Sequence, residues 1–80
     1  MDLKIEIWGK NFCKFCEESK ILLEEAGLPY KYRLLHYDFD EYEAKQEFPR
    51  SRTYPKILID GHWIGGYEEL VRILDEPAQK

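Results

Sequence analysis

The feature that most constrains this chain is its pair of cysteines, Cys13 and Cys16, which stand three positions apart between two hydrophobic patterns. Before the pair, apolar and charged residues alternate over residues 3–7, which is typical of a half-buried β-strand. After the pair, apolar positions recur at helical spacing until Gly27, which favours the end of a helix. The sequence therefore predicts a strand, a turn that carries both thiols, and a helix that begins beside them. The residues expected on the buried face of this helix are Phe15, Ser19, Leu22 and Ala26, with Cys16 and Leu23 beside them.

The predicted position of Cys13 favours a thiolate. A helix N-terminus presents unpaired backbone N–H groups and about half a positive charge, and both stabilise an anion. The pKa of a free cysteine, about 8.5, falls to about 3.5–7.5 at such sites. Cys13 is therefore the candidate nucleophile, and Cys16, one turn into the helix, is the candidate resolving thiol.

Three other roles are open to the two cysteines. A structural disulfide is disfavoured because a bridge between such close residues closes a very short loop and stabilises little. A zinc site needs two further ligands, and the spacing of His36 and His62 fits no known finger pattern, so no metal is expected. Two inert core cysteines remain an alternative, and a redox pair is the favoured interpretation.

Chain length and charge limit the classes of protein that this sequence can represent. Eighty residues are expected to form one domain, residues 1–80, with a frayed tail at residues 77–80. The net charge of −4 argues against nucleic-acid binding, which favours a basic surface. The chain has no apolar run of about 18 residues and no signal-peptide pattern, so we expect neither a membrane span nor secretion. We therefore expect a cytoplasmic location, where a C-x-x-C pair is more often catalytic than structural.

The rest of the chain predicts an α/β fold with the element order β-α-β-α-β-β-α. The first two strands should be parallel, because a helix connects them. Asp40 and Glu43 resemble a capping box, and Asp60-Gly61 indicates a tight hairpin between the last two strands. The result is a four-stranded mixed sheet flanked by helices. Beyond the first helix, strands are expected over residues 30–35, 56–59 and 62–64, and helices over residues 41–48 and 67–74, the last with Leu70, Val71, Ile73 and Leu74 on its apolar side.

Four short motifs, in this order and at these distances, are shared with a known family. They are Lys10-Asn11-Phe12-Cys13-Lys14-Phe15-Cys16, then Thr53-Tyr54-Pro55, then Asp60-Gly61, then Ile64-Gly65-Gly66-Tyr67-Glu68-Glu69-Leu70. With these motifs the chain resembles the glutaredoxins of the thioredoxin-fold superfamily, in particular the short dithiol type of bacteria and phages. The resemblance implies an enzyme that uses glutathione as co-substrate to reduce protein disulfides and glutathione mixed disulfides. It also implies ribonucleotide reductase as a protein partner, and a monomer.

The resemblance further implies a glutathione site. Pro55 should be cis and face the disulfide, so that the backbone of Tyr54 pairs with the cysteine of glutathione. Lys10 should bind the glycine carboxylate of glutathione. The N–H groups of Tyr67 and Glu68 should meet the γ-glutamyl carboxylate. The residues implied in glutathione binding are Lys10, Phe15, Thr53, Tyr54, Pro55, Gly65, Gly66, Tyr67 and Glu68, the two glycines because their missing side chains admit the peptide.

Two departures from the family pattern keep alternatives open. Lys14 replaces a proline that is frequent in dithiol glutaredoxins, and Phe15 replaces a frequent tyrosine. Some glutaredoxins without that proline form dimers that hold a [2Fe–2S] cluster through the first cysteine, here Cys13, and bound glutathione. A further alternative is a glutaredoxin-like hydrogen donor that thioredoxin reductase serves. The family arginine near the Thr-x-Pro motif matches either Arg50 or Arg52.

Overall fold

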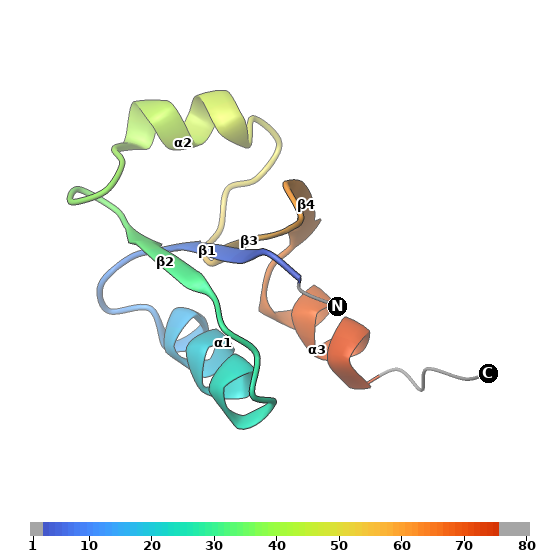
Figure 1. Ribbon diagram of the computed structural model, residues 1–80. Helices are drawn as coiled ribbons and strands as arrows, with labels where there is room; N and C mark the ends of the chain where they lie inside the picture. Colours follow the sequence, from blue (N-terminus) through green and yellow to red (C-terminus); the bar gives the residue numbers. More distant parts are fainter. Residues whose placement is uncertain (1–2, 76–80) are drawn as a thin grey trace.

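The computed structural model describes residues 3–75, which form one four-stranded sheet with helices on both faces (Figure 1). The order of elements confirms the predicted β-α-β-α-β-β-α arrangement. The predicted tail at residues 77–80 lies outside the described residues. The elements are β1 (Ile5–Gly9), α1 (Lys14–Glu25), β2 (Lys31–Leu34), α2 (Glu41–Glu47), β3 (Lys56–Ile59), β4 (His62–Gly65) and α3 (Tyr67–Asp75).

The sheet has the strand order β2-β1-β3-β4, so that β1 and β3 are its central strands. β1 runs parallel to β2, as predicted, and antiparallel to β3. The β3–β4 pair is an antiparallel hairpin. At its turn, Asp60 and Gly61 have φ values of 53° and 83°, and positive values at both positions are what a type I′ turn requires. The Asp60 carboxylate also accepts the N–H of Lys4 at 2.9 Å, which attaches the turn to the chain just before β1.

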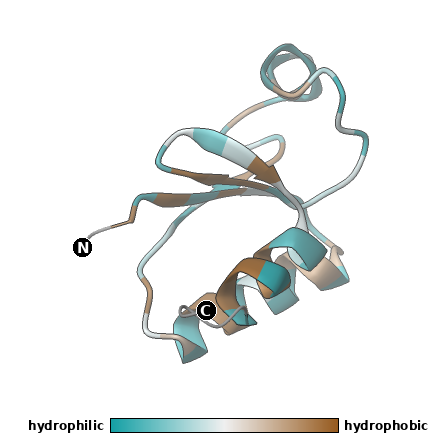
Figure 2. Cartoon of the chain, turned by 90° about the vertical axis from the view of Figure 1, so that its right-hand side faces the viewer, coloured by the Kyte–Doolittle hydropathy of each residue, from teal (hydrophilic) through white to brown (hydrophobic). Residues whose placement is uncertain are grey.

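The sheet separates two hydrophobic clusters. α1 and α3 cover one face of the sheet, and α2 lies on the other (Figure 2). Since both faces are covered, neighbouring residues on β1, Ile7 and Trp8, are both buried, with exposed fractions of 0% and 4%. The predicted alternation is found at Ile5, Glu6 and Ile7, which are buried, half-buried and buried, whereas Trp8, which follows the alternating residues, is buried on the other face. The cluster beneath α1 and α3 contains Ile5, Ile7, Leu23, Ile57 and Leu70, and the cluster on the α2 side contains Trp8, Leu35, Phe39, Ala44 and Phe48.

The ends of α1 follow the sequence, but its buried face is rotated from the predicted one. Cys13 is the N-cap. At the other end Gly27 has a φ of 72°, and the Leu28 N–H donates to the Leu23 carbonyl at 2.9 Å, which completes a Schellman motif. The buried residues of α1 are Cys16, Ser19 and Leu23, whereas Phe15 and Ala26 are exposed.

Phe15 is exposed because its ring stacks on Tyr67 of α3, with centroids 5.3 Å apart, rather than beneath the sheet. In α3 the prediction of the apolar side is likewise only partly confirmed: Leu70 is buried, but Ile73 is exposed. In α2 half of the predicted capping box is confirmed, since the Asp40 carboxylate accepts the Glu43 N–H at 2.8 Å. The Glu43 carboxylate instead lies 3.7 Å from the Arg33 guanidinium. Within residues 3–75, no helix has the length and apolar character that crossing a membrane requires.

Candidate active site

The two cysteines are joined by a disulfide at the N-terminus of α1. Cys13 has an extended backbone, and its sulfur accepts the N–H of Cys16 at 3.1 Å. The helix therefore directs a backbone donor at the Cys13 sulfur, and the same donor would bond more strongly to a thiolate. Cys13 keeps 9% of its surface exposed, and Cys16 keeps none. An incoming sulfur atom can therefore reach Cys13 but not Cys16 without a rearrangement.

The loop that precedes β3 carries Thr53, Tyr54 and Pro55, and the Tyr54–Pro55 peptide bond is cis, as the family resemblance implied. The Tyr54 ring stacks on Phe39 of the α2-side cluster, with centroids 6.3 Å apart. Burial is the main cause that raises the pKa of the Tyr54 phenol. Tyr54 therefore remains neutral at physiological pH and serves as a packing residue on this side of the sheet.

Lys56, directly after Pro55, is the unexpected residue of this region. Its exposed fraction is only 3%. Its ammonium donates to Ser51 Oγ at 3.0 Å, to the Thr53 carbonyl at 2.9 Å and to the Ser51 carbonyl at 3.4 Å. It also lies 4.3 Å from the centre of the Tyr54 ring, and burial lowers its pKa. Lys56 thus fixes the loop that leads into the cis bond, a role that no pattern in the sequence signals.

A groove of about 410 Å³ lies between the first turn of α1, the cis-proline loop and the first turn of α3. Its size is within the range of small-ligand sites, about 300–1,000 Å³. Seven of the nine residues implied in glutathione binding line this groove, and Lys10 and Gly65 do not. Lys10 lies on the loop after β1, with its ammonium 5.6 Å from the centre of the Tyr54 ring. The groove is lined by Phe15, Thr53, Tyr54, Pro55, Gly66, Tyr67, Glu68 and Glu69.

Glu69 organises the α3 side of this groove, although the sequence predicts no role for it in the site. The Gly66 N–H donates to its carboxylate at 2.8 Å, and this bond is the main cause that lowers the pKa of Glu69. This is one half of a capping box, in which a glutamate at the third helical position accepts the N–H of the N-cap residue. The glutamate three residues after Gly66 is therefore the sequence signal from which this bond could have been predicted. The N–H groups of Tyr67 and Glu68 occupy the first two helical positions, where the helix supplies no acceptor. They are the donors that the predicted carboxylate site requires.

The two glycines before α3 make room for protein atoms. Gly65 has a φ of 123°, and a Cβ there would lie 2.6 Å from Cγ of Glu69. A Cβ on Gly66 would lie 3.1 Å from the Pro55 carbonyl oxygen. Gly65 therefore lets the Glu69 side chain fold back over the helix start, and Gly66 lets the cis-proline loop approach α3. These contacts explain why glycine is needed at both positions for the fold itself, in addition to the predicted role of leaving space for glutathione.

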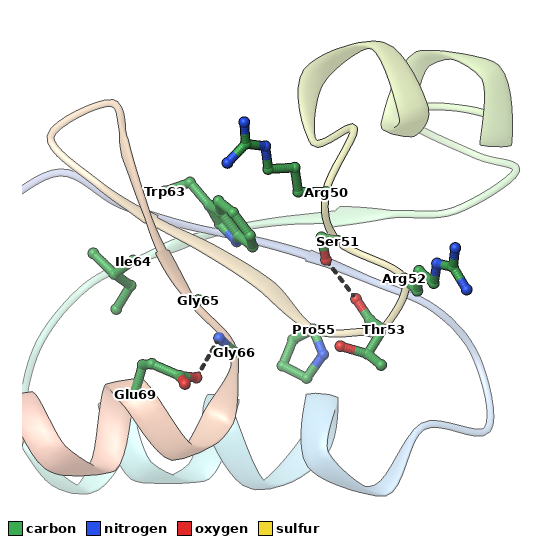
Figure 3. Close-up of a pocket in the computed structure, with 10 residues that line it drawn as sticks. All are labelled: Arg50, Ser51, Arg52, Thr53, Pro55, Trp63, Ile64, Gly65, Gly66 and Glu69. Carbon is green, nitrogen blue, oxygen red and sulfur yellow. Dashed lines mark hydrogen bonds between the residues drawn. The ribbon is translucent and has the colours of Figure 1, made fainter.

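A second groove, of about 420 Å³, shares Thr53, Pro55, Gly66 and Glu69 with the first (Figure 3). Both candidate arginines, Arg50 and Arg52, line this second groove rather than the one beside Tyr67. Trp63 of β4 lines it as well. Within residues 3–75, no group of three or more His, Cys, Asp or Glu side chains is placed to hold a metal ion.

The fold and the site together define a class of protein. A disulfide caps the helix that follows the first strand, and a cis-proline loop and a glycine-rich helix start form a groove beside it. In a four-stranded mixed sheet flanked by helices, this is the arrangement of the thioredoxin-fold thiol–disulfide oxidoreductases.

Comparisons with known proteins identify the family within that class. The glutaredoxin family model matches residues 5–64, and the chain belongs to the glutaredoxin family. The chain is 31% identical over 75 residues to glutaredoxin-C6 of rice, Oryza sativa subsp. japonica, a match that covers 90% of this chain and 67% of the rice protein. It is 29% identical over 75 residues to mitochondrial glutaredoxin-2 of Homo sapiens, covering 90% of this chain and 46% of the human protein.

Solved structures agree with this assignment. The crystal structure of glutaredoxin 1 from Francisella tularensis, complexed with cacodylate, superposes with a TM-score of 0.74 at 25% identity and covers 98% of this chain and 99% of that one. The chain spans about two thirds of the plant relatives it matches and about half of the mammalian ones.

Proposed function

We propose that this protein is a glutathione-dependent oxidoreductase that reduces glutathione mixed disulfides and protein disulfides. The observation that carries the proposal is the position of the Cys13 sulfur. This sulfur caps α1, and residue Cys13 keeps 9% of its surface exposed. The groove is lined by Phe15, two residues further along the chain. Membership of the glutaredoxin family supports the same activity.

The first proposed route needs only Cys13. Its thiolate attacks the glutathione sulfur of a mixed disulfide R–S–SG, the S–S bond breaks, and the R-thiolate leaves and takes a proton to become RSH. The enzyme then carries a Cys13–glutathione disulfide. The thiolate of a second glutathione attacks the sulfur of the bound glutathione, which forms oxidised glutathione and returns the Cys13 thiolate. The sum is RSSG + GSH giving RSH + GSSG.

The second proposed route uses both cysteines and acts on protein disulfides. The Cys13 thiolate attacks one sulfur of the substrate disulfide and forms a mixed disulfide with the protein. The Cys16 thiolate then attacks the Cys13 sulfur, which releases the substrate as a dithiol after protonation and leaves the Cys13–Cys16 disulfide. Two glutathione molecules reduce this disulfide and become one molecule of oxidised glutathione. The disulfide in the structure is the species that this route leaves.

The groove supports a specific orientation of glutathione. Its γ-glutamyl carboxylate would accept the N–H groups of Tyr67 and Glu68, at the positive end of α3. Its cysteine would pair with the backbone of Tyr54 in the manner of an added strand. Its glycine carboxylate would meet Lys10. Replacing Lys10 with Gln is therefore expected to raise the KM for glutathione severalfold.

The proposal extends to the cellular setting implied by the family resemblance. We propose a monomer in the cytoplasm in which residues 1–80 form one domain, and which reduces disulfide-bearing proteins, with ribonucleotide reductase as the first candidate. The turnover of purified ribonucleotide reductase, measured with glutathione, glutathione reductase and NADPH in the presence and absence of this protein, tests that partner. Turnover that does not depend on this protein would contradict it.

The deciding experiment compares electron donors on a small glutathione mixed disulfide. One reaction contains glutathione, glutathione reductase and NADPH, and the other contains thioredoxin reductase and NADPH. We expect turnover in the reaction that contains glutathione and glutathione reductase, and none in the reaction that contains thioredoxin reductase. Turnover with thioredoxin reductase alone would refute the glutathione site while keeping the Cys13 chemistry. Failure of both reactions would refute the oxidoreductase, and an anaerobic preparation that is brown and dimeric would then support the [2Fe–2S] alternative.

A further inference from the structure

We propose that Phe12 and the hollow beside it form a docking surface for an acidic polypeptide segment that carries an apolar side chain next to its disulfide. The surface would act when the substrate is a protein and would stay empty when the substrate is a small glutathione mixed disulfide. This inference rests on the proposed function for its substrate class. It goes beyond the glutathione site because Phe12 and the loop after β2 have no role there, and Lys10 alone of the lining residues is also assigned to glutathione.

The first observation is the exposure of Phe12. Its exposed fraction is 104%, so no neighbour within residues 3–75 covers the ring. Phe12 stands directly before Cys13 and therefore lies beside any substrate whose sulfur is bonded there. A fully exposed phenylalanine ring adds nothing to the hydrophobic core, so stability does not account for its presence at this position.

The backbone of Phe12 is the second observation. Its φ is 58°, in the left-handed region that a bulky residue with a Cβ rarely adopts. Glycine would take this conformation without steric cost. The position therefore holds a side chain that is unfavourable for both the local backbone and the exposed surface. Unfavourable backbone conformations of this kind cluster at functional sites.

The third observation is a hollow of about 330 Å³ next to the ring. It lies between the loops that follow β1 and β2, and these loops meet at one edge of the sheet because the two strands are parallel (Figure 1). Tyr37, on the second loop, is 74% exposed. The lining of this hollow and the lining of the glutathione groove have no residue in common. The hollow is lined by Lys10, Asn11, Phe12, Leu35, His36 and Tyr37.

Charge indicates the chemistry of the occupant. Lys10 and Lys14 stand two residues before and after Phe12, and both are exposed. Neither takes part in the ion pairs formed within residues 3–75. The Asp38 carboxylate, which accepts the Leu34 N–H at 2.8 Å, adds a negative charge on the loop after β2. The two lysines that flank Phe12 are the charges closest to it in the chain, and they complement an acidic segment.

The test begins with binding, measured without chemistry. In the Cys13→Ser/Cys16→Ser protein, whose fold is checked by circular dichroism, fluorescence anisotropy measures the Kd of a labelled disulfide peptide with aspartates and one phenylalanine beside its cysteines. Phe12→Gly in this background is expected to raise Kd about tenfold, the usual scale for an aromatic anchor. A peptide with lysines in place of the aspartates should bind at least tenfold more weakly than the acidic peptide. Equal binding of the two peptides, or no effect of Phe12→Gly, would overturn the proposal.

Activity provides the second readout, with glutathione and glutathione reductase as the electron source. Phe12→Gly should lower kcat/KM for the acidic disulfide peptide about tenfold and leave kcat/KM for a small glutathione mixed disulfide within twofold. Its thermal midpoint should equal or exceed that of the native protein. The matched control is Tyr42→Ala, which removes a 72% exposed aromatic ring from α2 and should change neither rate. If Phe12→Gly lowered kcat/KM equally for both substrates, the docking surface would be refuted. If the native protein turned over neither substrate, the proposed oxidoreductase function would be refuted, and the binding experiment alone would decide whether the docking surface exists.

Discussion

Replacing Lys56 with Met removes a buried ammonium while keeping most of the volume of the side chain. Two of its hydrogen bonds are short, 3.0 Å to Ser51 Oγ and 2.9 Å to the Thr53 carbonyl. Hydrogen bonds to charged groups contribute about 1.5–3 kcal/mol each, and a buried acceptor left without a donor costs about 1–3 kcal/mol. Removal of the desolvation cost of the ammonium offsets part of this loss. We expect the free energy of unfolding to fall by about 2–4 kcal/mol, and Tm to fall on the order of 15 °C.

Urea unfolding of the oxidised protein, followed by tryptophan fluorescence and far-UV circular dichroism, measures this change. Lys31→Met is the matched control, because Lys31 is an exposed lysine on β2, and its effect should stay within about 0.5 kcal/mol. Lys56→Met should also raise the KM for glutathione severalfold, since the loop that Lys56 holds lines the groove. A Lys56→Met protein as stable as the native one would refute the reasoning, because it would show that desolvation of the ammonium outweighs its hydrogen bonds.

The pH dependence of the same comparison provides an independent check. Burial lowers the pKa of Lys56 below its ordinary value of 10.5. Below the lowered pKa, both the folded and the unfolded chain keep the proton, and the full cost of burying the charge opposes folding. As pH rises from there towards 10.5, the folded chain releases the proton first, so this group adds stability. The stability difference between the native protein and Lys56→Met should therefore grow over this range, and a constant or shrinking difference would contradict the assigned burial.

Three further predictions concern the site and its supports. Cys13→Ser should abolish turnover of every disulfide substrate, whereas Cys16→Ser should retain activity on glutathione mixed disulfides and lose it on protein disulfides; a Cys13→Ser enzyme that still turns over would disprove the assignment. Glu69→Ala should lower the free energy of unfolding by about 1 kcal/mol at pH 7. The pKa of Glu69 in the folded protein lies below its ordinary value of 4.5, so its stabilisation is present above pH 4.5 and should disappear as pH falls through the folded pKa. Urea titrations at several pH values measure this, and a Glu69→Ala loss as large at low pH as at pH 7 would contradict the assigned hydrogen bond. Burial and the hydrogen bond to Glu24 raise the pKa of Tyr30 to about 12. Glu24→Gln should move the pKa, measured by tyrosinate absorbance, back towards 10. An unchanged titration would contradict that hydrogen bond.

The sequence predicted the elements whose causes are local. Asp60-Gly61 determines its hairpin because both residues accept positive φ, and the Asp40 cap of α2 depends only on a hydrogen bond three residues away. The position of Cys13 at a helix start follows from the two periodicities that meet there. The cis Tyr54–Pro55 bond could be expected only through the family resemblance, because the residues themselves favour trans.

The features that the sequence did not predict depend on contacts between distant segments. Phe15 is exposed because Tyr67, from the other end of the chain, offers it a ring to stack on. Lys56 is the exception, because its acceptors on Ser51 and Thr53 lie only five and three residues before it, but no hydrophobic period or turn motif marks a lysine that the preceding loop encloses. Trp8 is buried because α2 covers the face of the sheet on which alternation alone expects solvent. None of these contacts has a signature in the local pattern.

Tyr54 lines the proposed glutathione groove, and its side chain also packs against the α2-side cluster and stacks on Phe39. The cluster beneath α1 and α3 contributes no residue to that groove. A change of side-chain volume around Phe39 therefore reaches the groove through the Tyr54 ring, whereas a change within the cluster beneath α1 and α3 has no such direct contact with it. The α2 side of the sheet thus offers an indirect means of reshaping the groove without replacing a residue that lines it.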